Sequence, residues 1–139
     1  MKFDWLSYLE VAQILLQEVN NSRNQGNNLS INEAMIRSSI SRAYYSVFCL
    51  TRNYLRDTEG CSELRSLKLD VHKYIIDNLI KSKKIEFRNL GNDLRSLRLL
   101  RNKVDYEDEI PFHSLNAYAK TALKLANSII KILDKISQD

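Results

Sequence analysis

Glycine and proline are scarce in this sequence, which has three glycines and one proline among its 139 residues. A β-sandwich or barrel needs many tight turns, and these two residues supply most of them. No stretch of 18 uninterrupted apolar residues occurs, and Asp4 interrupts the early apolar run. A membrane span and a signal peptide are therefore not expected. These absences predict an all-α protein of the cytoplasm.

Cysteine and histidine are also scarce, with two of each in the chain. Cys49 and Cys61 are too few for a disulfide framework, and we expect reduced thiols, with Cys49 packing on a helix surface. His72 and His113 are 41 residues apart and have no cysteines beside them at metal-binding spacing. No glycine-rich phosphate loop is present. We therefore expect no metal and no cofactor.

Apolar residues make up 44% of the chain and recur at helical spacing. The pattern predicts five helices, over about 4–21, 30–56, 62–82, 86–105 and 114–136. Asp4 is the expected N-cap of the first helix, and Ser30 with Glu33 forms a capping-box pattern at the start of the second. The length and the short connections favour one domain, an antiparallel bundle of four long helices with one more.

Two of these helices have features that bear on packing. The apolar stripe of the first helix is expected to contain Leu6, Leu9, Ile14, Leu16 and Val19. Gly91 interrupts the fourth helix at a cost of about 1 kcal/mol relative to alanine. That glycine indicates either a kink or a close approach by another helix.

The second helix is unusual on the face opposite its apolar residues. That face holds Ser38, Arg42, Tyr45 and Cys49, where lysine and glutamate are more usual on an exposed surface. Small residues with a tyrosine suit close approach by another helix, including one from a second subunit. Composition alone leaves this interface and an ordinary exposed face equally open.

Charge is unevenly distributed along the chain, whose net charge is +4. Eight basic residues lie between Lys81 and Lys103, and four acidic residues follow between Asp105 and Glu109. Arg101 lies where the two blocks meet, four residues before Asp105, with which it can pair. One interpretation is a solvated helix end. The other is a partly shielded guanidinium that binds phosphate in a bidentate manner.

Two segments resemble those of a known family. "SRAYYSVF" (41–48) resembles the Arg-Ala-Tyr-Tyr-Ala-x-Phe segment of prokaryotic HEPN-domain proteins, and "LRSLRLLRNKVDYE" (94–107) resembles the Arg-x-x-x-Asp-Tyr segment that ends their fourth helix. The similarity covers the chain from about residue 30 to its end. It implies a helical bundle that usually dimerises. Family members are often ribonucleases of toxin–antitoxin or phage-defence systems, and many are encoded beside a minimal nucleotidyltransferase that acts as antitoxin.

The resemblance also implies candidate catalytic residues. Active members have an arginine, a polar residue and then a histidine four to six positions after the arginine, and they cleave RNA without a metal. Arg101 and Asn102 match the first two positions, whereas Tyr106 stands at the nearest position for the histidine. A phenol with a pKa of about 10 exchanges protons poorly near neutral pH. Arg101, Asn102 and Tyr106 thus form a degenerate motif from which weak or absent cleavage is expected.

The charge pattern and the resemblance together predict binding of RNA or a nucleotide. The candidate binding residues are Arg42, Tyr45, Arg98, Lys103 and Asp105. The first hypothesis is a homodimeric RNA-binding protein of the toxin or defence type. The second is a non-catalytic helical subunit that binds a nucleotidyltransferase or a nucleotide, and the third is a structural helical dimer. His72 and His113 are expected to be surface or half-buried residues rather than catalysts.

Overall fold

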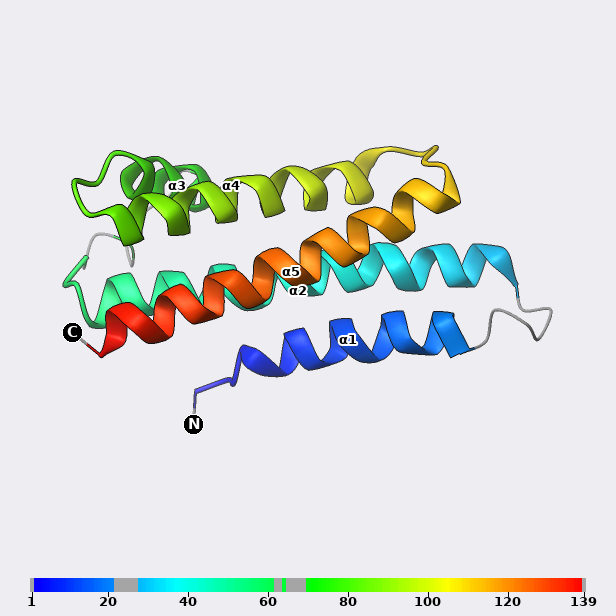
Figure 1. Cartoon of the computed structure of the whole chain (residues 1–139), viewed down its shortest axis with the longest axis horizontal. Coiled ribbons are helices and arrows are strands. Elements are labelled where there is room, and N and C mark those ends of the chain that lie inside the picture. The colour runs from blue at the N-terminus through cyan, green and yellow to red at the C-terminus, as the bar shows by residue number, and fades with distance from the viewer. Residues whose placement is uncertain (1, 22–27, 62–63, 65–69, 139) are drawn as a thin grey trace.

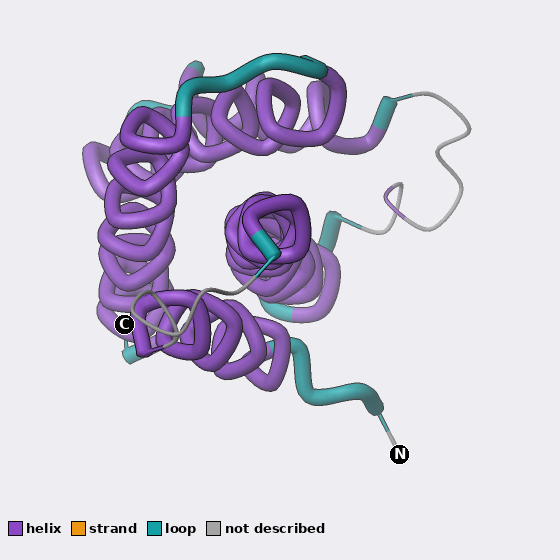
Figure 2. The backbone as a smooth tube through the Cα atoms, turned by 90° about the vertical axis from the view of Figure 1, so that its right-hand side faces the viewer, coloured by secondary structure: helices purple, strands orange, loops and turns teal. Residues whose placement is uncertain are grey.

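The computed structural model describes residues 2–21, 28–61, 64 and 70–138 of the chain. Those residues contain five α-helices and no β-strand, so the all-α prediction is confirmed (Figure 2). The helices are α1 (Leu6–Asn21), α2 (Leu29–Asp57), α3 (Val71–Ile80), α4 (Ile85–Tyr106) and α5 (Phe112–Ser137). None of them is both long and apolar enough to cross a membrane.

The helices form an up-and-down bundle in which α2 and α5 occupy the middle (Figure 1). α1 packs along α2 on one side, and α4 packs on α2 and α5 on the other side. The short helix α3 lies against α4 and runs antiparallel to it. Because α2 contacts α1, α4 and α5, its side chains can meet residues from both sides of the bundle.

Short polar side chains determine where α1 and α2 begin. The backbone N–H of Leu6 donates a hydrogen bond to Asp4 Oδ1 at 3.1 Å, which agrees with the predicted cap of α1. The capping box predicted from Ser30 and Glu33 is wrong. α2 begins earlier, because the N–H of Ser30 donates to the side chain of Asn28 at 2.9 Å and Asn28 is the N-cap.

The third helix is shorter than predicted. α3 begins at Val71, because Asp70 is its N-cap and accepts a hydrogen bond from the N–H of Lys73 at 3.1 Å. Positions 62–63 and 65–69 of the predicted helix lie outside the described residues. Tyr74 is 36% exposed, and the buried face of α3 is formed by Ile75, Ile76 and Leu79.

The apolar stripe predicted for α1 is only partly correct. Leu9, Leu16 and Val19 are buried, but Leu6 is 41% exposed and Ile14 is 56% exposed. Ile14 lies five residues after Leu9, a spacing that places it well round the helix from the buried face. Hydrophobic character alone therefore assigns these two residues to the wrong surface.

The central helix α2 is buried over more of its circumference than predicted. Ile36, Ile40, Ala43 and Val47 are fully buried and form its core face. Cys49 was expected on the helix surface, and that prediction is wrong because Cys49 is 4% exposed. Burial raises the pKa of its thiol. The rest of the proposed second face is more open, since Ser38 and Arg42 are exposed and Tyr45 is half-buried.

Gly91 lies where α3 and α4 approach each other closely. A Cβ atom at this position would lie 2.8 Å from Leu79 Cβ and 2.9 Å from the backbone N of Ile80. Side-chain atoms cannot approach a neighbouring backbone that closely, so only glycine fits without a shift of α3. Of the two explanations offered for Gly91, close packing is confirmed.

Candidate functional site

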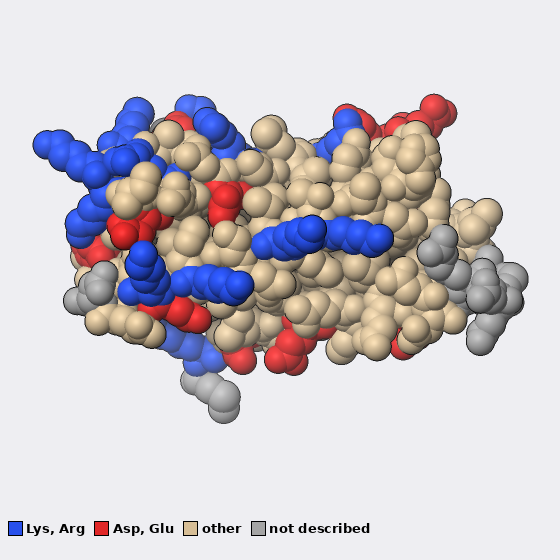
Figure 3. Space-filling model, in the orientation of Figure 1, with Lys and Arg blue, Asp and Glu red and all other residues tan. Residues whose placement is uncertain are grey.

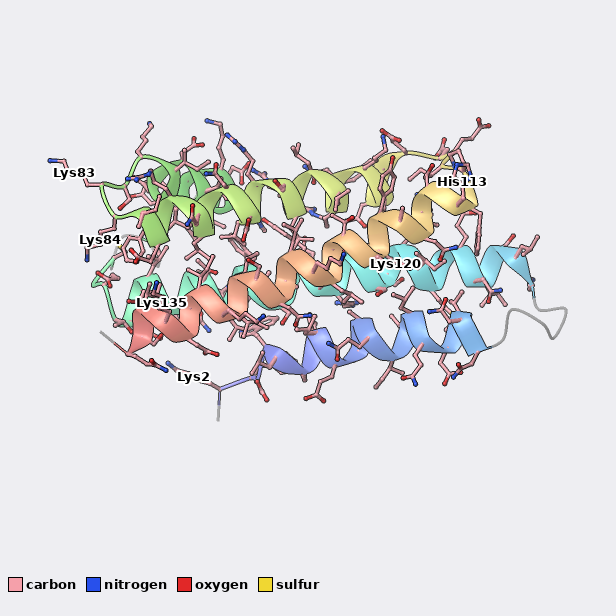
Figure 4. The ribbon with its side chains drawn as sticks, in the orientation of Figure 1. Lys2, Lys83, Lys84, His113, Lys120 and Lys135 are labelled. Atoms are coloured by element: carbon pink, nitrogen blue, oxygen red, sulfur yellow. The ribbon has the colours of Figure 1, made fainter. Side chains whose placement is uncertain are left out.

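Basic side chains are unevenly distributed along the bundle (Figure 3). Basic residues gather at the end where α3 turns into α4 (Figure 3). Lys83 and Lys84 are exposed in that turn; Lys83 points away from the body of the molecule, and Lys84 lies over the ring of Phe87 (Figure 4). The exposed acidic residues Glu107, Asp108 and Glu109 lie at the other end of α4. Arg101 lies between the two regions, within the last two turns of α4.

Arg101 is buried in spite of its charge, with 7% of its surface exposed. Its guanidinium carbon lies 5.1 Å from the centre of the Tyr44 ring and 5.4 Å from the centre of the Tyr45 ring. Both distances are within the range of cation–π attraction. The two tyrosines of the "SRAYYSVF" segment on α2 therefore both contact the arginine of the second segment on α4.

The guanidinium of Arg101 lacks a close acceptor among the described residues. Its Nη1 is 3.7 Å from Asp105 Oδ2, beyond the usual length of a charge-assisted hydrogen bond. Its Nε is buried and has no hydrogen-bond partner among those residues. Burying a charge that is incompletely paired costs several kcal/mol. The simple helix-end salt bridge is thus a poor description of Arg101.

Arg98 lies one turn earlier on α4 and is half-buried. Its Nη2 donates to Asp70 Oδ2 at 2.8 Å, and this hydrogen bond, with that from the N–H of Lys73, lowers the pKa of Asp70. The Nε of Arg98 is also buried without a partner in the described part of the chain. One carboxylate therefore caps α3 and holds Arg98, which ties the beginning of α3 to the second half of α4.

His72 belongs to the same cluster, although its sequence position gives little sign of it. Its ring stacks on Phe48 with 3.9 Å between ring centres and on Tyr44 at 5.6 Å. Its Nδ1 forms a 2.7 Å hydrogen bond with the hydroxyl of Tyr44. His72 is half-buried, as predicted, but it touches the same two tyrosines as Arg101.

These five residues form what we call the Arg101 cluster: Tyr44, Tyr45, His72, Arg98 and Arg101. Burial lowers the pKa of His72 to about 4, with further lowering from the positive charges of Arg98 and Arg101. Burial also raises the pKa of Tyr44 well above its ordinary value. At neutral pH the cluster therefore combines two permanent cations with a neutral imidazole and a neutral phenol.

A polar groove of about 420 Å³ lies beside the cluster, between α2 and α4. Three of the predicted binding residues line it, namely Arg42, Tyr45 and Asp105. Tyr45 and Asp105 also contact Arg101, so the groove adjoins its guanidinium. Arg42 lies over the ring of Tyr8, 4.8 Å from its centre, and remains exposed. An extended ligand could bind in this groove next to the buried Arg101.

The other predicted residues lie on the outside of α4. Asn102 is half-buried, and Lys103 Nζ lies 3.3 Å from Glu107 Oε2 and near the ring of Tyr118. Tyr106 is the last residue of α4 and is 75% exposed. It makes no ring contact with the Arg101 cluster in the described structure. Arg101, Arg98, Tyr45 and Asp105 are thus brought together, while Tyr106 and Lys103 are not.

Arg37 neutralises the end of α4 that lies next to the cluster. Its Nη1 donates to the carbonyl oxygens of Val104 and Glu107, both at 2.7 Å, and its Nη2 donates to that of Asp108 at 3.3 Å. Its guanidinium also pairs with Glu33 at 2.9 Å. Since the last carbonyls of a helix otherwise lack donors, Arg37 serves as the C-terminal cap of α4.

Replacing Arg37 by methionine should lower the free energy of unfolding by about 2 kcal/mol, because hydrogen bonds to charged groups contribute 1.5–3 kcal/mol. The measurement is urea denaturation followed by circular dichroism. Arg95→Met is the matched control, since Arg95 is exposed on α4 and, among the described residues, donates to Asn92 alone. The control should change stability by less than about 0.5 kcal/mol. Equal effects of the two variants would contradict the capping role.

Comparisons with known proteins identify one distant relative. An uncharacterized protein of Methanocaldococcus jannaschii (MJ0628) is 37% identical over 89 residues. The match covers 57% of this chain and 54% of the archaeal protein, so the chain spans about half the length of that relative. No family model matches the chain, and no solved structure matches it. Within the described residues, no group of three or more histidines, cysteines or acidic residues could hold a metal ion.

Proposed function

We propose that this protein is a HEPN-type protein that binds single-stranded RNA, with a backbone phosphate held at Arg101. The single observation that carries the proposal is the state of Arg101 itself. Its guanidinium is buried against two tyrosine rings, its nearest carboxylate is 3.7 Å away, and its Nε has no partner among the described residues. A phosphate oxygen is the acceptor that such a planar, permanently charged group binds best.

The surroundings of Arg101 support an extended ligand more than a single ion. Arg98 adds a second positive charge one turn away, and the polar groove leads past Arg42. The half-buried ring of Tyr45 lies between the groove and Arg101, where an unpaired base can stack on an aromatic surface. The arginines can therefore bind phosphates, and Tyr45 can stack on a base, of one strand that lies along the groove.

Two further parts of the proposal rest on the resemblance to HEPN-domain proteins. We propose a homodimer and, as a partner, a nucleotidyltransferase antitoxin in a toxin–antitoxin or phage-defence system. Metal-independent cleavage is expected to be weak, since the motif position of the histidine is occupied by Tyr106.

A non-catalytic interaction subunit is the second candidate function. It is favoured by Leu99 and Tyr106, which lie seven residues apart on α4 and are 65% and 75% exposed. Residues at this spacing share one helix face, so they give α4 an apolar outer surface that a protein partner could cover. This surface is separate from the enclosed side of Arg101.

The test compares wild type with Arg101→Gln in binding to a labelled single-stranded RNA over a range of salt concentrations. Loss of one charged hydrogen-bonding group should weaken binding by roughly tenfold to a hundredfold. It should also flatten the dependence of log affinity on log salt by about 0.7 for each phosphate contact removed. Arg95→Gln is the control, because it removes an exposed arginine from the same helix.

Each outcome has a defined meaning. Equal losses of RNA affinity in Arg101→Gln and Arg95→Gln would show that RNA binds through general charge attraction, which would contradict a specific site at Arg101. Absence of binding by the wild type, together with capture of a nucleotidyltransferase encoded beside this protein, would favour the interaction subunit. The same RNA incubated with chelator measures cleavage, and strong cleavage that is lost in Arg101→Gln would overturn the expectation of weak activity.

A further inference from the structure

His72 is held in a fixed orientation by aromatic neighbours from α2. Its ring is parallel to that of Phe48, with 15° between the planes and 3.9 Å between the centres. The edge-to-face contact with Tyr45 places the ring centres 6.0 Å apart at 84°. Asp70, two residues before His72, is the N-cap of α3. An imidazole packed in this way cannot turn freely, so its two nitrogens have separate surroundings.

The hydrogen bond to Tyr44 determines which nitrogen carries the proton. Tyr44 is fully buried, and its hydroxyl has no partner other than His72 Nδ1 in the described structure. A buried hydroxyl whose hydrogen lacks an acceptor is costly, so the O–H of Tyr44 donates and Nδ1 accepts. The proton of the neutral ring then resides on Nε2. That N–H has no acceptor among the described residues.

The charges around His72 are mainly positive. Arg98 and Arg101 on α4 and Arg52 on α2 disfavour the imidazolium, whereas among the described residues Asp70 alone favours it. The groups that face the ring from all packed elements are Tyr44, Tyr45, Arg52, Asp70, Arg98 and Arg101. A phosphate bound at Arg101 would add negative charge next to this ring, since Arg101 and His72 contact the same tyrosines.

We propose that His72 is a further phosphate-binding residue of the Arg101 cluster, and that binding of an RNA phosphate brings a second proton onto its ring. Nε2–H donates to a phosphate oxygen, while Tyr44 fixes the ring. When the ring gains its proton, that proton resides on Nδ1 and the Tyr44 oxygen accepts from it, so the negative charge of the phosphate must also offset the cost of leaving the Tyr44 hydrogen without its acceptor. The inference rests on the proposed function, because it requires an RNA phosphate at Arg101.

The direction of the pH dependence follows from the charges. In the free protein His72 takes up its proton only at acidic pH, since burial and the arginines lower its pKa to about 4. The phosphate favours the charged ring, so its pKa rises in the complex. Each unit of that rise strengthens binding by up to tenfold at pH values below the raised pKa. Affinity should therefore increase as pH falls from about 7 toward about 5, by about tenfold for each pH unit between the raised pKa and the pKa of the free protein.

The probe is a short oligouridylate with methylated 2′-oxygens, which cannot be cleaved and whose bases do not take up protons in this range. Calorimetry at about pH 5.5 in two buffers with different ionisation enthalpies gives the number of protons bound with the ligand. Affinities are compared for wild type, His72→Gln and His113→Gln. His113 lies at the start of α5 and is the second histidine of the chain (Figure 4).

We expect proton uptake by the wild type and by His113→Gln, and loss of both the uptake and the pH dependence in His72→Gln. Proton uptake is measured on the wild type, so it tests the inference even where His72→Gln folds poorly. Wild-type binding that requires Arg101 but takes up no proton would overturn the role of His72 and leave the proposed function intact. Absence of binding at every pH would overturn the proposed function itself.

Discussion

Replacing Arg101 by methionine is expected to remove most of the RNA affinity while leaving the bundle as stable as before or more stable by about 1 kcal/mol. Methionine fills a similar volume and needs no hydrogen-bond acceptors. The wild-type guanidinium is buried with an unpaired Nε and a distant carboxylate. Removing such a charge relieves a desolvation cost that the cation–π contacts with Tyr44 and Tyr45 offset only in part.

The comparison with Arg37→Met makes this prediction specific. Both side chains are shielded from solvent. Arg101 belongs to the second half of α4, whereas Arg37 of α2 donates hydrogen bonds to three carbonyl oxygens at the end of α4. Urea denaturation should therefore show a lower free energy of unfolding for Arg37→Met and no decrease for Arg101→Met. RNA affinity, in contrast, should fall more in Arg101→Met than in Arg37→Met. A loss of stability in Arg101→Met as large as in Arg37→Met would mean that Arg101 serves the fold and not a ligand.

Replacing Gly91 by valine is expected to lower the free energy of unfolding by about 3 kcal/mol or more. Overpacking of a close contact typically costs 1–3 kcal/mol, and a β-branched side chain adds atoms beyond the Cβ. The Cβ alone would already lie 2.9 Å from the backbone N of Ile80, which cannot turn away as a side-chain tip can. Gly91→Ala should lower the free energy of unfolding less than Gly91→Val does, because alanine favours the helix by about 1 kcal/mol relative to glycine.

Ser96→Val is the control for Gly91→Val, since Ser96 is exposed on the same helix and the change tests valine propensity without the contact. Thermal and urea unfolding measure the difference. The Gly91 variant should also reduce RNA affinity at temperatures where it is still folded, because α3 contains His72 and has Asp70 as its N-cap. Full stability in Gly91→Val would show that α3 can move away from α4 at little cost.

Helical structure was predictable because apolar spacing is a local property of the chain. The predicted bounds of α2 and α4 differ from the observed ones by one residue at each end. Errors arise where a local pattern has two solutions. Both Asn28 and Ser30 can cap a helix, and Asn28 does so. Ile14 is apolar but lies on the exposed side of α1, and only the neighbouring helices determine that.

The candidate site was predictable in part for the same reason. Arg101 and Asp105 share one helix, and the two tyrosines lie in a segment that the resemblance singled out. His72 is 29 residues before Arg101, and its role depends on how α3 docks against α2 and α4. The available signal was weak: an aspartate that can cap a helix two residues before a lone histidine. Pairing α3 with α4 as a hairpin would have brought His72 toward Arg98 and Arg101.

The contact at Gly91 suggests how this architecture could be traced in more divergent sequences. Gly91 and Arg98 are seven residues apart, so both lie on the side of α4 that faces α3, and Arg101 follows three residues later. A chain that kept the arginines but had a large residue at the glycine position would have to move α3 outward and separate the histidine from them. We therefore expect related chains that form this site to have a glycine seven positions before the first of the two arginines. They should also have a histidine near the capped beginning of the preceding helix. The arginines alone do not indicate that the site is assembled.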